Sequence, residues 1–275
     1  MPILKIGNVR VRRDSNEDTV IIKDSSSINE SVKYINEFNV KNVDVDDFNW
    51  DDLNFLKECL SIEKLSILNH FIKDLSGIYG LIKLRVLSIN EATTKAEFRI
   101  DELKNLEELY GELPKNTFGI NKLKRLQKVE LWGYKPKTRN LNEFKNLKSL
   151  NVISLAQSRL DTLDGIEKIV NLKSLGLYYL RTLKDITALQ DVKAPITELF
   201  FENCKSIVDF SPIQNLKELE KLKISSSGDI PSLSFVSTLN KLKSLVFSGT
   251  NVLDENLTVC EGIEYIYYTK QKLKS

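Results

Sequence analysis

The chain has 275 residues, 41% of them hydrophobic, which is enough for a substantial core that needs no partner to form. Its 40 basic and 38 acidic residues leave a formal net charge of +2, which excludes the global charge excess typical of proteins that coat nucleic acids or anionic membranes. The 3 cysteines show no CxxC spacing, which fits reduced thiols better than a disulfide framework. No run of about 20 apolar residues occurs, which excludes a transmembrane helix.

Residues 1–39 are predicted to form an N-terminal cap. Gly7-Asn8 separates two runs of alternating apolar residues, a pattern typical of a β-hairpin, and residues 20–22 add a third strand. A helix is expected next, because Ser27 and Glu30 have the spacing of a capping box. Its apolar stripe consists of Ile28, Val32, Ile35 and Phe38. We expect this stripe to cover the open end of the structure that follows.

Residues 40–262 contain about ten copies of one pattern, LxxLxL. The first apolar position of successive copies lies at Val40, Ile62, Leu84, Leu106, Leu126, Leu150, Leu172, Ile196, Leu219 and Leu242, and once more at Ile263. These positions are 20 to 24 residues apart, and 22 is the commonest step. Self-similarity at such a period is the signature of a repeat architecture.

Each copy is expected to form one coil of a solenoid. The second and third apolar residues of LxxLxL are two apart, which puts both on one face of a short strand. The spacing that follows, as in Leu160, Leu163 and Ile166, suits a 3₁₀ turn with its apolar side inward. Stacked coils give a parallel sheet on one side and turns on the other, so the fold class is an α/β solenoid. Residues 263–275 are expected to add a C-terminal strand and a short basic tail.

The LxxLxL copies resemble the leucine-rich repeat family, in particular its 22-residue class of internalin-like and phosphatase-regulator-like proteins. The resemblance implies a horseshoe with a parallel concave sheet and 3₁₀ or short-helix turns on the convex side. Many members place asparagine three residues after the third apolar position. Here those slots hold Phe48, His70, Ala92, Pro114, Tyr134, Ser158, Leu180, Cys204, Ser227 and Thr250. Serine, threonine, cysteine and histidine can replace some of the asparagine hydrogen bonds, whereas phenylalanine, alanine, proline and leucine cannot, so we expect irregular turns.

The sequence contains few of the residues and motifs that catalytic sites require. His70 is the only histidine and occupies one of these slots, where we expect a structural hydrogen bond. Cys204 occupies another slot, and Cys59 and Cys260 have no neighbouring metal ligands, so zinc is not expected. No GxxxxGK[ST] or GxGxxG phosphate loop occurs. We therefore predict no enzymatic activity, no metal and no cofactor.

The outward residues of the predicted strands form a concave surface, where solenoid proteins usually bind partners. Over ten strands these positions hold nine acidic and four basic side chains, a net charge of −5. The acidic ones are Asp44, Asp46, Asp47, Glu91, Glu108, Glu112, Glu130, Glu198 and Glu202, and the basic ones are Lys64, Lys128, Lys221 and Lys223. Five large rings stand among them, a residue type enriched in interface hot spots. The alternative is that such rings stabilise neighbouring strands.

From this face we predict the partner-binding residues Asp44, Asp46, Glu108, Tyr110, Glu112, Glu130, Trp132, Tyr178, Tyr179, Glu198, Phe200 and Glu202. Lysines gather instead in the turns before the strands, as at Lys145 and Lys148, and are interpreted as a solvated edge. The loop of residues 134–139 is longer and basic. Either it clamps a partner beside Trp132 or it is a simple insertion.

These features favour a cytoplasmic, non-catalytic module that captures a basic protein surface on its acidic, aromatic face. By analogy with stand-alone repeat proteins of low-GC bacteria, it is a candidate immunity protein that neutralises a toxin. One alternative is a secreted, internalin-like protein that interacts with a host. Another is a nucleic-acid binder along the lysine-bearing edge, which the negative face disfavours. No membrane association is expected, and the sequence leaves the oligomeric state open.

Overall fold

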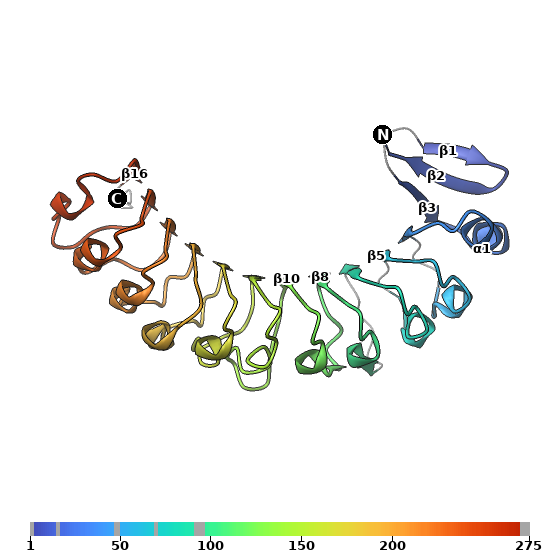
Figure 1. Cartoon of the computed structure of the whole chain (residues 1–275), viewed down its shortest axis with the longest axis horizontal. Helices are drawn as coiled ribbons and strands as arrows, with labels where there is room; N and C mark the ends of the chain where they lie inside the picture. The colour runs from blue at the N-terminus through green and yellow to red at the C-terminus, as the bar shows by residue number, and fades with distance from the viewer. Residues whose placement is uncertain (1–2, 15–16, 47–49, 69–70, 91–96, 270–275) are drawn as a thin grey trace. The chain divides into compact units, whose positions relative to one another are not determined.

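The structure is a computed structural model that describes residues 3–14, 17–46, 50–68, 71–90 and 97–269. The chain divides into two compact units, Met1–Leu126 and Gln127–Ser275, called unit 1 and unit 2 below. In each unit, strands lie along one side and 3₁₀ turns (η) along the other, as Figure 1 shows. A strand and the turn that follows it make one coil, so both units are solenoids.

Unit 1 begins with an antiparallel hairpin and continues as a parallel sheet. Its strands are β1 (Ile3–Ile6), β2 (Val9–Arg13), β3 (Asp18–Ile22), β4 (Asn42–Asp46), β5 (Lys64–Leu68), β6 (Val86–Asn90), β7 (Phe98–Arg99), β8 (Glu108–Gly111) and β9 (Thr117–Phe118). Its helical segments are η1 (Ser25–Ser27), α1 (Ile28–Glu37), η2 (Asn54–Leu56), η3 (Ser76–Ile78), η4 (Ile100–Glu102) and η5 (Ile120–Lys122). β1, β2 and β3 pair antiparallel, whereas β3, β4, β5, β6 and β8 pair parallel. The short strands β7 and β9 form a separate parallel pair.

The predicted hairpin and helix are both present at the start of unit 1, but the helix begins differently. Gly7 has φ of 61°, as the tight turn between β1 and β2 requires. The capping-box prediction is wrong: Ser27 makes no side-chain cap, because the chain enters α1 through η1, which Asp24 caps. Glu30 accepts hydrogen bonds from the backbone N–H and the side-chain amide of Asn8 instead. The helix is thereby tied to the hairpin turn.

The predicted apolar stripe of α1 is buried only in part. Ile35 is fully buried, and α1 packs against β2, β3 and η2. Phe38 is 60% exposed, because it lies past the end of the helix and packs on the ring of Tyr34 at a centroid distance of 4.5 Å. The cap therefore covers the first coil with fewer apolar groups than the spacing predicts.

Unit 2 has seven described strands, and the same register recurs in all six of their pairings. Its strands are β10 (Lys128–Trp132), β11 (Val152–Ala156), β12 (Ser174–Tyr178), β13 (Glu198–Glu202), β14 (Lys221–Ser225), β15 (Ser244–Ser248) and β16 (Tyr265–Thr269). Its turns are η6 (Ile166–Lys168), η7 (Thr187–Asp191), η8 (Ser211–Asn215), η9 (Ser234–Thr238) and η10 (Thr258–Cys260). All these strands pair parallel, with equivalent residues opposite each other.

The core of each unit consists of the LxxLxL residues, as predicted. On β11, for example, Ile153 and Leu155 are fully buried, while the residues between and beside them are half-exposed. Leu160, Leu163 and Ile166 in the following turn are fully buried as well. We call the surface opposite the buried leucines the open face of the sheet. Its side chains alternate with those of the core along every strand.

In unit 2 the residue directly after each of six strands adopts a left-handed conformation. These residues are Gly133, Gln157, Tyr179, Asn203, Ser226 and Gly249, with φ between 48° and 62°. Each N–H donates to the carbonyl of the last residue of the next strand; that of Tyr179, for instance, reaches the Glu202 carbonyl oxygen at 2.7 Å. The bend keeps the hydrogen-bond ladder intact while the chain turns away from the sheet.

The slots that replace the asparagine ladder act as expected where their residues can form hydrogen bonds. The Cys204 N–H donates to the Ser227 hydroxyl oxygen at 3.2 Å, and the Ser227 N–H donates to the Thr250 hydroxyl oxygen at 3.0 Å. Ser158 accepts from the Tyr134 N–H in the same way. The other described slots hold buried side chains instead, those of Pro114, Tyr134 and Leu180. Phe48, His70 and Ala92 lie outside the described residues.

Candidate protein-binding surface

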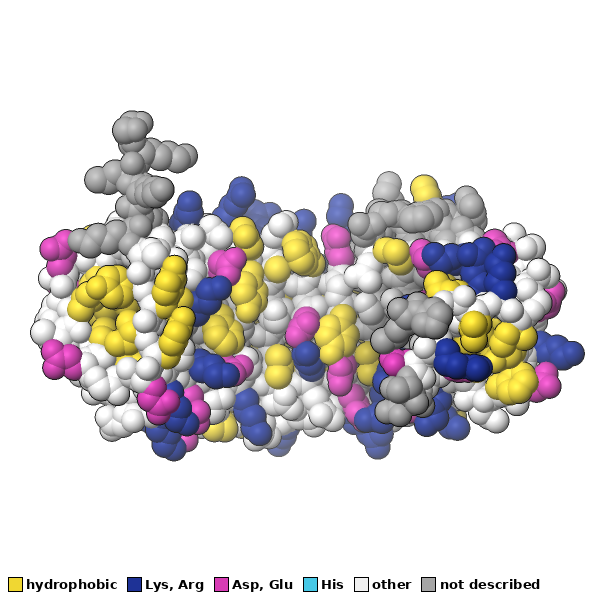
Figure 2. Space-filling view, turned by 90° about the horizontal axis from the view of Figure 1, so that it is seen from above, with side chains coloured by type: hydrophobic (Ala, Val, Ile, Leu, Met, Phe, Trp, Pro, Cys, Tyr) yellow, Lys and Arg dark blue, Asp and Glu magenta, His cyan; other side chains and the backbone are white. Residues whose placement is uncertain are grey.

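The open face of unit 2 is a grid, because its strands pair in equal register. One row across the sheet runs through Trp132, Ala156, Tyr178, Glu202 and Ser225. The neighbouring row runs through Glu130, Ser154, Gly176, Phe200 and Lys223. Three of the predicted rings therefore lie in two adjacent rows, separated by small residues. Figure 2 shows this face as yellow side chains between scattered charges, in the left half of the view.

Tyr178 lies flat across the sheet rather than upright on it. A Cβ atom placed on Gly176 would lie 2.6 Å from the Tyr178 ring, so the ring occupies the space above this glycine. Its partial burial there raises the pKa of the Tyr178 hydroxyl. The missing side chain at Gly176 thus creates a shallow seat for one ring next to Phe200.

Trp132 and Tyr179 extend further into solvent. Trp132 ends β10 and is 54% exposed, and Tyr179 follows β12 and is 43% exposed. Tyr179 also holds a left-handed backbone with φ of 60°, a conformation that a bulky side chain rarely adopts. The same bend follows five other strands of unit 2, so the feature that sets Tyr179 apart is its exposed ring.

The carboxylates of this face are not free. Glu198 and Glu202 pair with Lys221 and Lys223 at 2.8 and 2.9 Å. Glu130 pairs with Lys128 at 2.9 Å. Among the described strands of unit 2, the open face therefore carries three carboxylates, three lysines and no net charge. The negative face expected from the sequence does not extend over this unit.

On unit 1 the two predicted acidic residues of β4 also have cationic partners. Asp44 and Asp46 on β4 lie 2.7 and 2.6 Å from the side chains of Arg12 and Lys23. The count from sequence left these cations out, although Arg12 alternates with the apolar residues of a predicted strand. That strand joins the same sheet, so its outward residues share the open face. Asp47 and Glu91 lie outside the described residues.

The remaining predicted residues of unit 1 are spread out. Tyr110 on β8 donates its hydroxyl to Glu108 of the same strand. Glu112 follows β8 and is exposed. Tyr110 shares a row with Asp44, but β5 and β6 lie between their strands. The structure thus gathers the rings of unit 2, not the acidic residues of unit 1, into one patch.

The loop of residues 134–139 is anchored at its start. Tyr134 is buried, its ring packs on Phe144, and its hydroxyl donates to the Glu143 carboxylate at 2.7 Å. Burial raises the pKa of this hydroxyl. Pro136 is buried too, whereas Lys135 and Lys137 are exposed. The anchored side chains hold the loop against its coil and leave its lysines in solvent.

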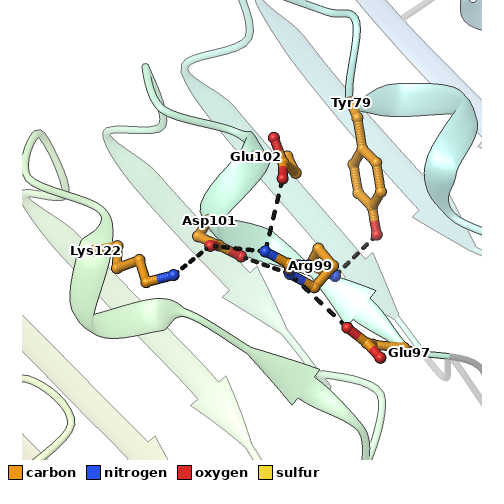
Figure 3. Close-up of polar contacts among 6 residues, drawn as sticks. All are labelled: Tyr79, Glu97, Arg99, Asp101, Glu102 and Lys122. Atoms are coloured by element: carbon orange, nitrogen blue, oxygen red, sulfur yellow. Dashed lines mark hydrogen bonds and ion pairs between the residues drawn. The ribbon is translucent and has the colours of Figure 1, made fainter.

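A second charged cluster lies in the turns of unit 1, away from the open face (Figure 3). It comprises Tyr79, Glu97, Arg99, Asp101, Glu102 and Lys122. Asp101 accepts from Lys122 at 2.8 Å and from the Arg99 guanidinium at 3.3 Å. The Lys122 hydrogen bond, with Arg99, holds the pKa of Asp101 below its usual range. The cluster holds three carboxylates and two cations, and its ion pair between Asp101 and Lys122 braces η4 against η5.

The described residues hold no obvious reactive centre. Cys59, Cys204 and Cys260 are buried free thiols. Burial raises the pKa of Cys59 and of Cys204 to about 11, so neither is a thiolate at neutral pH. No group of three or more metal-ligating side chains occurs in the part of the chain that the structure describes. In that part, no helix is long and apolar enough to cross a membrane.

Comparison with known proteins identifies the fold. Neither a protein-family model nor a curated protein sequence matches the chain. Among solved structures, an internalin of Listeria monocytogenes aligns over 93% of this chain and 87% of its own, with 14% identity and a TM-score of 0.52. The Toll–Spatzle complex of Drosophila aligns over 95% of this chain but 41% of its own, with 12% identity and a TM-score of 0.64. The chain has the leucine-rich repeat fold.

Proposed function

We propose that the chain is a protein-binding module whose contact surface is the open face of unit 2. The observation that carries the proposal is the patch of Trp132, Tyr178, Tyr179 and Phe200, which lies on three strands and in the turn after one of them. A large aromatic ring exposed to water lacks the packing contacts that it would make if a partner buried it. Tyr and Trp at the centre of an interface supply much of its binding energy.

The electrostatics of the described face support an apolar contact more than capture of a basic surface. A basic partner needs carboxylates that are free to pair with it, yet Glu130, Glu198 and Glu202 already pair with lysines of the same face. Exposed ion pairs of this kind contribute little on their own and cost little to leave in place. A toxin-neutralising role inside a bacterial cell stays a prediction that rests on analogy.

Two further functions remain as alternatives. The match to an internalin supports the fold, and a secreted, host-directed role would draw on the same rings. Nucleic-acid binding along the lysines that precede the strands has less support, since Lys241 and Lys243 there pair with Glu218 and Glu220. A protein partner remains the best-supported ligand class.

The test compares three forms of the protein in affinity capture from a lysate of the source organism. The ring variant carries Trp132→Ala and Tyr178→Ala. The control variant carries Val170→Ala and Val208→Ala, which remove exposed apolar side chains from the turns of the same unit. We expect a partner that the wild type and the control retain and the ring variant loses, at unchanged circular dichroism. Equal capture by all three forms would show that the rings are structural.

A further inference from the structure

The edge of the sheet where the strands of unit 2 end carries a row of cations. Counting one residue past the asparagine-type slot in four successive coils gives Lys135, Arg159, Arg181 and Lys205. All four side chains are exposed. We call these four residues the basic ridge. Figure 2 shows dark-blue side chains along the upper edge of the left half of the view.

The ridge differs from the cations on the open face of unit 2, each of which pairs with a carboxylate. The ion pairs formed by the described residues of this unit involve Lys128, Arg139, Lys221, Lys223, Lys241 and Lys243. No described carboxylate pairs with a member of the ridge. Neighbouring coils are about 4.8 Å apart, so like charges are held side by side. Such an arrangement costs free energy unless an anion binds.

A groove of about 360 Å³ lies between the two arginines of the ridge. It is lined by Gln157, Ser158, Arg159, Tyr179, Arg181 and Thr182, with no carboxylate among them. Ser158 and Thr182 use their hydroxyls within the fold, where they donate to the carbonyls of Ala156 and Leu160. The side-chain polar groups of the other four lining residues make no hydrogen bond with another described residue. These groups are mainly hydrogen-bond donors.

We propose that the groove and the ridge bind an acidic, extended polypeptide segment, whose carboxylates pair with Arg159 and Arg181. The proposal rests on the proposed function, because the groove shares Tyr179 with the aromatic patch and so extends the same contact surface. Guanidinium groups bind carboxylates through two parallel hydrogen bonds, which favours arginine at the centre of the ridge. Lys135 and Lys205, one coil further out on each side, then attract the flanking charges of the segment.

The geometry favours a polypeptide over a nucleic acid. A nucleic acid is held by many phosphate contacts along a broad basic surface. Here four cations follow one edge, and the open face beside them carries as many carboxylates as lysines on its described strands. An extended peptide, in contrast, can run along the edge and leave the face to the rest of the partner.

The test uses a capped oligoglutamate peptide as the probe, with oligoglutamine and oligothymidylate of equal length beside it, in titrations at low ionic strength. The ridge variant carries Arg159→Gln and Arg181→Gln. The matched control carries Lys145→Gln and Lys148→Gln, which remove the same charge from exposed residues in the turn before β11. We expect oligoglutamate to bind the wild type and the control alike, and the ridge variant to bind about tenfold more weakly.

Three results would overturn the proposal. They are no binding of oligoglutamate, an equal loss of affinity in both variants, and tighter binding of oligothymidylate through the same arginines. The Trp132→Ala/Tyr178→Ala variant separates this test from that of the proposed function. It retains the arginines, so it should bind oligoglutamate normally even though it loses the captured partner. Loss of the partner without loss of the peptide, and the reverse, therefore identify which of the two proposals fails.

Discussion

Some residues of unit 2 hold a left-handed backbone conformation that lowers the stability of the fold. Asn203, one coil after Tyr179, holds the same left-handed bend with φ of 55°. Asparagine tolerates that conformation, whereas for other residues it costs roughly 1–2 kcal/mol. The sequence signals this bend through Gly133, Asn203 and Gly249, but nothing in it indicates that Tyr179 and Gln157 must bend too. Their strain follows from the ladder hydrogen bond that each N–H makes with the next strand.

Replacing Tyr179 with asparagine should therefore stabilise the protein while it impairs binding. We expect Tyr179→Asn to raise the free energy of unfolding by about 0.5–1 kcal/mol, since it relieves the backbone strain. Urea denaturation of the variant and the wild type measures this change, and capture of the partner measures the loss of binding. A lower free energy of unfolding would mean that the Tyr179 ring supports its coil.

A second consequence at this scale concerns the buried thiol of Cys204, whose pKa rises to about 11 because burial disfavours the thiolate. The unfolded chain releases this proton near the ordinary value of 9.0, so the folded state binds it more tightly between these pH values. Its contribution to stability is complete below pH 9 and is lost as the pH rises towards 11.

Denaturation at pH 8, 9, 10 and 11 measures this effect, given that one pKa unit is worth about 1.4 kcal/mol. The wild type should lose about 2 kcal/mol more than a Cys204→Ala variant over this range. The variant is the control, because every other titrating group is common to both proteins. Parallel pH profiles would contradict a buried, protonated thiol at this position.

At the scale of single elements, the sequence predicts the strands and turns that recur in every coil, and it misses the contacts that occur only once. Strands and 3₁₀ turns follow from the apolar spacing, because one buried side of a short strand needs residues two apart. The way the chain enters α1 does not follow from the apolar spacing. It depends on the Asp24 cap of η1 and on the hydrogen bond that Glu30 accepts from Asn8, and spacing alone shows neither contact. The same holds for the partners of Asp44 and Asp46: an outward position is predictable, but a counter-charge depends on which strand lies beside it.

At the scale of the solenoid, stability should fall towards the C-terminal end of unit 2. The strand β16 has β15 on one side, and no described strand pairs with its other edge. Ile266 and Tyr268 occupy the inward row of β16 but remain 37% and 49% exposed. Leu175 and Leu177 in the same rows of β12 are fully buried. A coil covered on one side only has about half of the stabilising neighbours of an inner coil.

Amide hydrogen exchange followed by mass spectrometry tests this gradient. Peptides from β16 should exchange faster than peptides from β12 by at least about tenfold, because local opening at an end exposes fewer buried groups. Peptides from β13 serve as an internal comparison and should match β12. Equal protection of β16 and β12 would mean that the last coil is covered in solution.

The equal register of the strands also governs how a bound partner is aligned. The basic ridge repeats a similar side chain from coil to coil, so a charged segment that contacted nothing else could shift by one coil, about 4.8 Å, at little cost. The rings do not repeat from coil to coil, because the Tyr178 ring lies above Gly176 in one coil only. The ridge also ends, because the equivalent position in the next coil is Gly228 and carries no charge. Charge therefore determines whether a segment stays on the edge, and the non-repeating residues determine the single offset at which it stops.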